Sequence, residues 1–152
     1  MKVTLTTMAM IQSLNTNEVL VQERTRKWPG LSFPGGKVES AESFYDCAVR
    51  EIKEETGLTI DNLEACGVVH WNEIDTGERY LVFLYKTHSF SGDLIEEFTE
   101  GRHFWYDADE LMKLPPEKFS NDRVRYCHLY FAKAFAEAYI PYNNDCFDLI
   151  YF

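Results

Sequence analysis

The sequence lacks any long hydrophobic run, and its first residues, MKVTLTTMAM, do not contain the apolar stretch of a secretory signal. We therefore expect a cytoplasmic protein with no membrane partner. Cysteine is also scarce, and no pair has the C-x-x-C spacing. The wide separation of Cys47, Cys66, Cys127 and Cys146 predicts reduced structural cysteines and argues against a zinc site or a disulfide framework.

Basic residues are in the minority. The chain has 15 Lys and Arg against 25 Asp and Glu, which gives a formal net charge of −10. This excess of negative charge disfavours duplex nucleic acid and anionic membrane surfaces as main partners. A nucleotide is still a compatible ligand, because a bound cation can reverse the local electric field.

The composition indicates a folded chain. Of 152 residues, 45% are hydrophobic and 15% aromatic, which is enough apolar material for a layered core and too much for a disordered chain. No repeat, low-complexity tract or linker interrupts the sequence. We expect one domain over residues 1–152.

Periodicity predicts an alternation of strands and helices, with the first two strands joined as a hairpin by a turn at residues 15–17. Strands are expected over residues 2–12, 18–22, 63–71, 79–87, 103–106 and 146–152, a loop over 23–31, and helices over 41–56, 107–113 and 124–139. Strands followed by a helix, further strands and another helix favour an α/β fold, with a mixed sheet between helices.

The helix expected over Ala41–Thr56 is amphipathic. Its apolar positions, Tyr45, Ala48, Val49 and Ile52, follow the spacing i, i+3, i+4, i+7 and predict a core-facing side. Ser40 is the expected N-cap and Gly57 the expected stop signal.

The same helix places three carboxylates together. Glu51, Glu54 and Glu55 stand at i, i+3 and i+4, where like charges cost roughly 0.2–0.5 kcal/mol per pair. A solvated charged face, relieved by Arg50 or Lys53, is the commonest reason for such a run.

The segment before the helix favours a functional reading instead. Phe33-Pro34-Gly35-Gly36-Lys37 reads as a strand end followed by a glycine turn, which lets the backbone approach a ligand closely. It would bring carbonyl oxygens and Lys37 near the carboxylates. Hard oxygen ligands of this kind suit Mg²⁺ or Mn²⁺, which would bridge phosphate oxygens while one carboxylate activates a water.

The run GKVESAESFYDCAVREIKEETGL, from Gly36 to Leu58, resembles the Nudix box, G-x5-E-x7-R-E-U-x-E-E-x-G-U with U aliphatic, at every fixed position. The resemblance implies an α/β/α sandwich with a mixed β-sheet. It also implies cation-dependent cleavage of a diphosphate linked to another group. The Pro115-Pro116 break and the expected long final helix resemble the MutT-type branch of the family.

The resemblance also implies roles in the cation site. Glu54 and Glu55 match the principal cation ligands, and Glu51 matches a further ligand or the general base. Arg50 matches the residue that orients the glutamates through ion pairs. The carbonyl of Gly36, or of its neighbour Gly35, matches a further cation ligand, and Lys37 matches a phosphate contact. Which glutamate acts as the base is left open.

Further site residues lie outside the box. Glu100 resembles the additional carboxylate of MutT-type enzymes, with Glu97 as its competitor and a solvated acidic loop as the alternative for both. Arg24, at the end of the second strand, is a candidate phosphate or sugar contact or a surface charge. Phe33 is a candidate wall of a base pocket or a core residue.

In MutT-type enzymes an asparagine near the last helix reads the purine edge, and Asn121 matches it; an N-cap is the alternative. Trp28 and Trp71 are large enough to stack on a base, although packing is the favoured role. His70 and His103 are expected to be packing or surface residues.

The leading hypothesis is an enzyme, a Mg²⁺- or Mn²⁺-dependent nucleoside triphosphate pyrophosphohydrolase that releases a monophosphate and pyrophosphate. Oxidised purine triphosphates such as 8-oxo-dGTP are candidate substrates. The alternatives are a dinucleoside polyphosphate or a capped or 5′-triphosphate RNA as substrate, and a non-catalytic Nudix-fold regulator that binds nucleotides. ADP-ribose hydrolases of the family have a proline downstream of the box, and the absence of proline between Pro34 and Pro115 makes the chain dissimilar to that class. The protein is expected to be a monomer or a homodimer.

Overall fold

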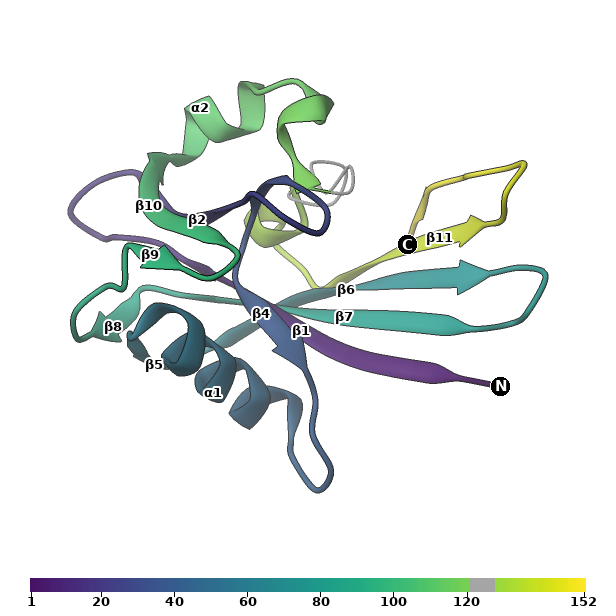
Figure 1. The fold of residues 1–152 in the computed structure, drawn as a ribbon, viewed down its shortest axis with the longest axis horizontal. Coiled ribbons are helices and arrows are strands. Elements are labelled where there is room, and N and C mark those ends of the chain that lie inside the picture. Colours follow the sequence, from purple (N-terminus) through teal and green to yellow (C-terminus); the bar gives the residue numbers. More distant parts are fainter. Residues whose placement is uncertain (121–127) are drawn as a thin grey trace.

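The computed structural model describes residues 1–120 and 128–152. Two β-sheets face each other, and one long helix lies outside the larger sheet (Figure 1). The larger sheet has the order β12-β11-β6-β7-β1-β4 and the smaller one has the order β3-β2-β10-β9. A two-stranded ladder pairs β5 with β8.

The strands of the larger sheet are β1 (Val3–Ile11), β4 (Gly35–Lys37), β6 (Glu64–Glu73), β7 (Arg79–Thr87), β11 (Ala136–Tyr142) and β12 (Ile150–Tyr151). The pairs β1·β7 and β6·β11 are parallel, whereas the remaining pairs are antiparallel. This is the mixed sheet that the α/β prediction required, and the fold class is confirmed.

The remaining elements are β2 (Glu18–Arg24), β3 (Gly30–Ser32), β5 (Thr59–Asp61), β8 (Ser89–Ser91), β9 (Glu97–Phe98), β10 (Gly101–Asp107), α1 (Phe44–Thr56), α2 (Ala108–Lys113) and two 3₁₀ turns, Pro116–Lys118 and His128–Phe131. Among the described residues, no helix is long and apolar enough to cross a membrane.

Helix α1 begins later than expected. Its N-cap is Ser43, whose hydroxyl accepts a hydrogen bond from the Asp46 N–H at 3.0 Å, and Ser40 lies outside the helix. The reason is that the Glu42 carboxylate accepts a hydrogen bond from the Glu39 N–H and so closes a turn before the helix. The end of the helix is confirmed, because Gly57 adopts a left-handed φ of 79° that favours glycine.

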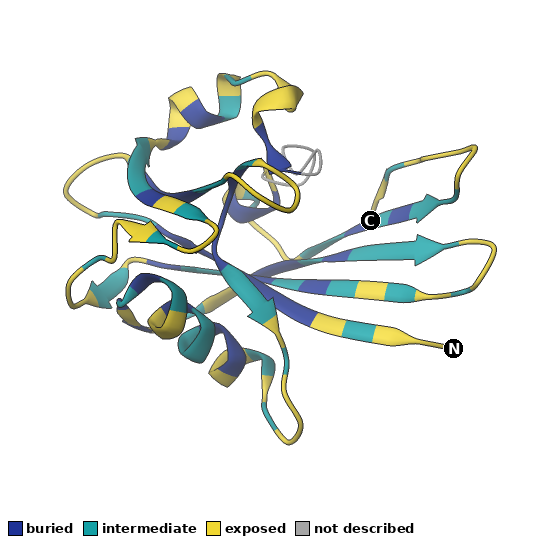
Figure 2. Ribbon diagram, in the orientation of Figure 1, coloured by how far each residue is buried: buried dark blue, intermediate teal, exposed yellow. Residues whose placement is uncertain are grey.

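The core has two parts. Between the sheets lie apolar side chains such as Met10, Val21, Leu84 and Ile140. Beneath α1, Ile52 packs with residues of β1, β2 and β5 in a smaller cluster. Figure 2 shows that burial is concentrated where the two sheets and α1 overlap, and that the free ends of β1, β6 and β7 are more exposed. The helix is thereby fixed against β1 and β4, with its acidic side at the edge of the sheet.

Two predictions about the elements were wrong. The helix expected over Val124–Tyr139 is absent from its described part, where a 3₁₀ turn and β11 occur instead. The apolar residues there satisfy a period of two equally well: Ala138 and Ile140 are buried in the core, while Glu137 and Tyr139 face the other side of the sheet. Pairing with β6 therefore decided the outcome.

The expected hairpin of the first two strands was the second error. β1 pairs with β4 and β7, whereas β2 belongs to the other sheet and pairs with β3 and β10. Only one bridge, between Gln12 and Val19, joins the two strands near the turn. The loop expected over residues 23–31 is shortened accordingly, because β2 runs to Arg24 and β3 begins at Gly30.

Candidate active site

The acidic side of α1 lies against the glycine strand β4. An added Cβ at Gly36 would overlap the carboxylate of Glu51, so the absence of a side chain there is what lets the helix approach. The Cys47 thiol, on the buried side of α1, lies 3.7 Å from the Gly36 carbonyl and 3.4 Å from the Lys37 carbonyl. The Gly35-Gly36-Lys37 segment and the glutamates of the helix are therefore brought together, as the sequence predicted.

Arg50 is the centre of an ion-pair network. Its Nε and Nη2 donate to the two oxygens of Glu42 at 2.7 and 2.9 Å, and its Nη1 lies 2.9 Å from Glu51 and 3.2 Å from Glu54. The Arg50 guanidinium, together with the Glu39 N–H, lowers the pKa of Glu42 to about 2. These are the contacts expected of a residue that orients the glutamates; a catalytic role for Arg50 stays a prediction.

Glu55 has the opposite environment. Its Oε2 is buried and has no hydrogen-bond partner. Burial, followed by the charge of Glu51, raises the pKa of Glu55 to about 7, although the Gly35 N–H partly stabilises the carboxylate. An unpartnered carboxylate oxygen beside a second carboxylate is a site where positive charge is needed.

The donor set therefore fits a hard divalent cation, with Glu51, Glu54, Glu55 and the backbone of Gly35-Gly36 as the residues that would hold it. Within residues 1–120 and 128–152, no three His, Cys, Asp or Glu side chains lie together in an arrangement that would already hold a metal ion. Arg50 pairs with one oxygen of Glu51 and one oxygen of Glu54, so the second oxygen of each carboxylate would be the one that a cation binds.

A cavity of about 460 Å³ adjoins the helix. Its lining includes Glu54 and Glu55 from α1 and both carboxylates that were considered outside the box, Glu97 and Glu100. The Glu100 carboxylate is held by Arg24, whose Nη2 lies 2.9 Å from its Oε2. The structure thus places Glu97 and Glu100 at the same cavity and leaves the choice between them as ligand untested. We refer to this space as the acidic cavity.

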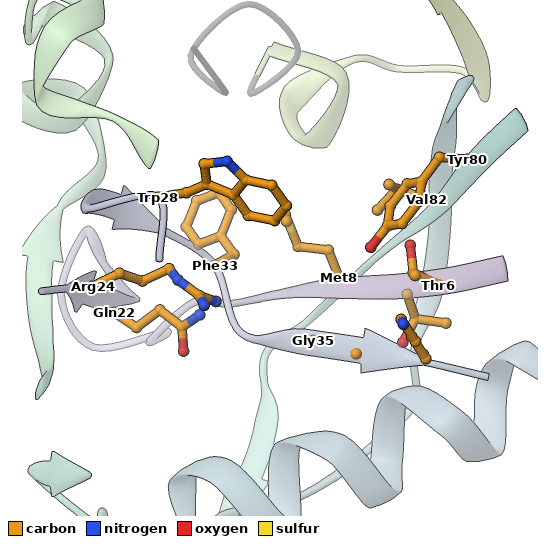
Figure 3. Close-up of a pocket in the computed structure, with 12 residues that line it drawn as sticks. Thr6, Met8, Gln22, Arg24, Trp28, Phe33, Gly35, Tyr80 and Val82 are labelled. Carbon is orange, nitrogen blue, oxygen red and sulfur yellow. The ribbon is translucent and has the colours of Figure 1, made fainter. Parts of the chain in front are cut away.

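A second cavity, of about 170 Å³, lies beside β4, with Arg24 at one end and Tyr80 at the other (Figure 3). It is lined by the predicted residues Arg24, Phe33, Gly35, Gly36 and Lys37, by Trp28, for which packing was the favoured role, and by six residues that the sequence interpretation did not consider: Thr6, Thr7, Met8, Gln22, Tyr80 and Val82. We call it the nucleoside pocket.

Aromatic rings border this pocket on two sides. Trp28 lies beside Phe33, and Tyr80 stands across the pocket on β7 (Figure 3). Phe33 is both a wall and a core residue, because it is 4% exposed and its ring packs edge-on against Tyr130. Trp28 is 52% exposed, which is unusual for a tryptophan with only a packing role. The sequence did contain a signal that Trp28 lines the pocket, because Trp28 follows the candidate phosphate contact Arg24 in the same expected loop. Tyr80 had no such signal, because only strand pairing brings it there.

Asn121 and Cys127 are outside the described residues. The remaining aromatic, histidine and cysteine residues considered from the sequence lie away from the two cavities or pack in the core. Trp71 packs against Tyr142 and Phe147. His70 bonds Glu137 and Arg79 on the open face of the sheet, and His103 is buried beside Phe98. Cys47 and Cys66 are free and buried, and Cys146 is free and exposed.

Comparisons with known proteins agree with this geometry. A family model described as the NUDIX domain matches residues 4–129. The crystal structure of a mutator MutT protein from Bacillus halodurans superposes with a TM-score of 0.79 at 25% identity, covering 97% of this chain and 95% of that one. The chain belongs to the NUDIX domain family.

Curated relatives are similar over part of their length. The uncharacterized Nudix hydrolase YvcI of Bacillus subtilis is 35% identical over 101 residues, covering 64% of this chain and 62% of that protein. An oxidized purine nucleoside triphosphate hydrolase of Danio rerio is 34% identical over 85 residues, covering 56% of this chain and 52% of that protein. An NAD-capped RNA hydrolase of Pseudomonas aeruginosa is 32% identical over 104 residues, covering 67% of this chain and 36% of that protein. The chain thus spans less than two thirds of each.

Proposed function

We propose that this protein is a Mg²⁺- or Mn²⁺-dependent nucleoside triphosphate pyrophosphohydrolase that releases a nucleoside monophosphate and pyrophosphate. The observation that carries the proposal is the ion pair that joins two cavities, because Arg24 lines one of them and Glu100 lines the other. The acidic cavity is lined by Glu55, one of whose carboxylate oxygens has no partner, and the other cavity is bordered by Trp28 and Phe33. A purine triphosphate needs both kinds of site, one for its phosphates and one for its base.

The positively charged and the negatively charged side chains of the site have different proposed roles. The ammonium of Lys37 and the guanidinium of Arg24 border the nucleoside pocket and would donate to phosphate oxygens. Glu51, 16% exposed and packed on Gly36, is the candidate base that accepts the proton of the attacking water. When bound, the cation supplies positive charge that stabilises the transferring phosphoryl group.

Oxidised purine triphosphates such as 8-oxo-dGTP are the substrates that we favour. The support is the relative named as an oxidized purine nucleoside triphosphate hydrolase and the MutT-like structure. Asn121 stays the candidate reader of the purine edge, on the family resemblance alone. The relative named as an NAD-capped RNA hydrolase makes NAD a necessary comparison substrate, and the formal net charge of −10 disfavours long RNA.

The test is a substrate panel with purified protein and Mg²⁺ or Mn²⁺, containing canonical and oxidised nucleoside triphosphates, diadenosine polyphosphates, ADP-ribose and NAD. Products would be separated by chromatography, and reactions in ¹⁸O-labelled water would show which phosphorus is attacked. We expect monophosphate and pyrophosphate, fastest from an oxidised purine. Cleavage of dinucleotides or sugar-linked substrates alone would contradict the substrate proposal. Metal-dependent binding without any turnover would favour a regulatory module.

A further inference from the structure

Arg24 links the nucleoside pocket to the acidic cavity. Its side chain lines the nucleoside pocket, and its Nη2 is ion-paired with Glu100, which lines the acidic cavity. Arg24 is the last residue of β2 and is paired in register with Gly101 of β10 and Gly30 of β3. The guanidinium therefore projects from a strand that is hydrogen-bonded on both sides.

Glu100 is also fixed at its backbone. The Glu100 carbonyl accepts hydrogen bonds from the Thr25 N–H at 2.9 Å and from the Thr25 hydroxyl at 3.2 Å. The next residue, Gly101, passes so close to the Glu23 carbonyl that an added Cβ would overlap it. Because the backbone is held, any displacement of the Glu100 carboxylate requires a side-chain rotation away from Arg24.

Arg24 has a second contact on the nucleoside side. Its Nε donates to the Lys27 carbonyl at 3.1 Å, within the turn that ends at Trp28. Trp28 has a left-handed φ of 52°, and its own carbonyl accepts from the Ser120 hydroxyl at 2.6 Å. The Trp28 wall of the pocket is thus braced on one side by Arg24.

The pairing with Glu100 conflicts with phosphate binding. A carboxylate 2.9 Å from the guanidinium neutralises its charge and repels an incoming phosphate. The same carboxylate lines a cavity together with Glu55, whose unpartnered oxygen needs positive charge nearby. The Glu100 carboxylate cannot fully neutralise the Arg24 guanidinium while it also binds a cation.

We propose that Arg24 couples the two cavities: a cation that attracts Glu100 releases the charge of Arg24 for the phosphate of a nucleotide in the neighbouring pocket. Cation and nucleotide then bind cooperatively, and the cation-free protein binds nucleotide weakly. This inference rests on the proposed function, because it assumes that a nucleotide occupies the nucleoside pocket.

The experiment is calorimetric binding of dGMP, in EDTA and in Mg²⁺, to the wild type and three variants. dGMP is not a substrate of the proposed reaction and binds Mg²⁺ weakly, so the readout is independent of turnover. Glu100→Gln removes the competing charge, and Arg24→Met removes the guanidinium. Glu23→Gln is the matched control, since Glu23 pairs with Arg102 at 3.1 Å across the same two strands, one residue along.

The affinities in EDTA are decisive because no cation is present there. In Mg²⁺ the wild type should bind dGMP about tenfold more tightly than in EDTA, within the usual range of coupling between sites. Glu100→Gln should reach much of that gain in EDTA alone. Arg24→Met should bind weakly in both conditions and lose most of the Mg²⁺ effect, whereas Glu23→Gln should behave as the wild type. Thermal melting would confirm that each variant is folded.

Two results would overturn the coupling. Glu100→Gln could bind dGMP in EDTA no more tightly than the wild type, or Arg24→Met could keep the full Mg²⁺ effect. Either result, with hydrolysis of triphosphates by the wild type intact, would leave the proposed function standing. A wild type that binds dGMP in neither condition and hydrolyses no triphosphate would instead overturn the proposed function.

Discussion

Two carboxylates, Glu42 just before α1 and Glu55 in its last turn, have opposite environments. Glu42 receives two hydrogen bonds from Arg50, and its pKa falls to about 2. Glu55 is buried beside Glu51, has an oxygen without a partner, and its pKa rises to about 7. The negative charge of Glu42 is therefore balanced by Arg50 of the same chain. The negative charge of Glu55 has no such partner and is suited to a positively charged ligand.

The largest expected effect is on turnover. Glu54→Gln or Glu55→Gln should lower kcat by at least about 100-fold, because a cation ligand is lost while the core is untouched. Steady-state kinetics with the best triphosphate would measure it. Glu110→Gln is a matched control: its side chain is 62% exposed, as against 59% for Glu54, and each carboxylate is ion-paired within its own helix. Normal activity in a normally folded Glu54→Gln protein would contradict the ligand assignment.

The two adjacent glycines should separate stability from activity. An added Cβ at Gly35 would overlap the Thr7 carbonyl, a backbone atom that cannot move away, so Gly35→Ala should lower the free energy of unfolding by about 1–3 kcal/mol. At Gly36 the overlap is with the Glu51 side chain, which can rotate. Gly36→Ala should therefore keep most of the stability and lower kcat by about tenfold, since Glu51 is displaced.

Urea unfolding and kinetics on both proteins would test this contrast. Equal losses of stability at the two positions would show that Glu51 is held too firmly to rotate.

Removing the built-in charge should destabilise the fold moderately. Arg50→Met leaves Glu42 and Glu51 without their shared partner, and we expect a loss of about 1–2 kcal/mol in the free energy of unfolding at pH 7, because the network is partly exposed. Lys53→Met, which removes an exposed contact to the Gly57 carbonyl, is the control and should change the stability by less than about 0.5 kcal/mol. An equal effect in both would mean that the Arg50 network contributes little.

The smallest effect concerns acid stability. The pKa of Glu42 is lower in the folded protein than in the unfolded chain, so its stabilisation is fully present above pH 4.5 and is lost as the pH falls toward about 2. The difference in stability between the wild type and Glu42→Gln should therefore shrink over that range. Urea unfolding at pH 6, 4 and 3 would measure it, and a constant difference would contradict the assignment.

Predictions succeeded where the signals are local. The end of α1 at Gly57, the position of the glutamates beside Gly35-Gly36, and the strand over residues 79–87 all follow from periodicity and glycine placement. The Nudix box adds a family constraint that the comparison with the NUDIX domain confirmed.

Predictions failed where a local pattern served two structures. Residues 136–142 have apolar spacing compatible with a helix or a strand, and pairing with β6 selected the strand. The turn at residues 15–17 was recognised, but no local signal shows that the two strands beside it enter different sheets.

The family, the acidic helix and the glycine strand against which it packs could be identified from the sequence, because these features depend on residue identity at short, fixed spacing. The ion pairs and the burial of charged groups at the site depend on contacts that form only in the folded chain. Residues 24 and 100 meet through the pairing of β2 with β10, and Tyr80 reaches the nucleoside pocket through the pairing of β1 with β7. Burial and ion pairing depend on which distant segments come into contact, and the packing of the two sheets determines those contacts.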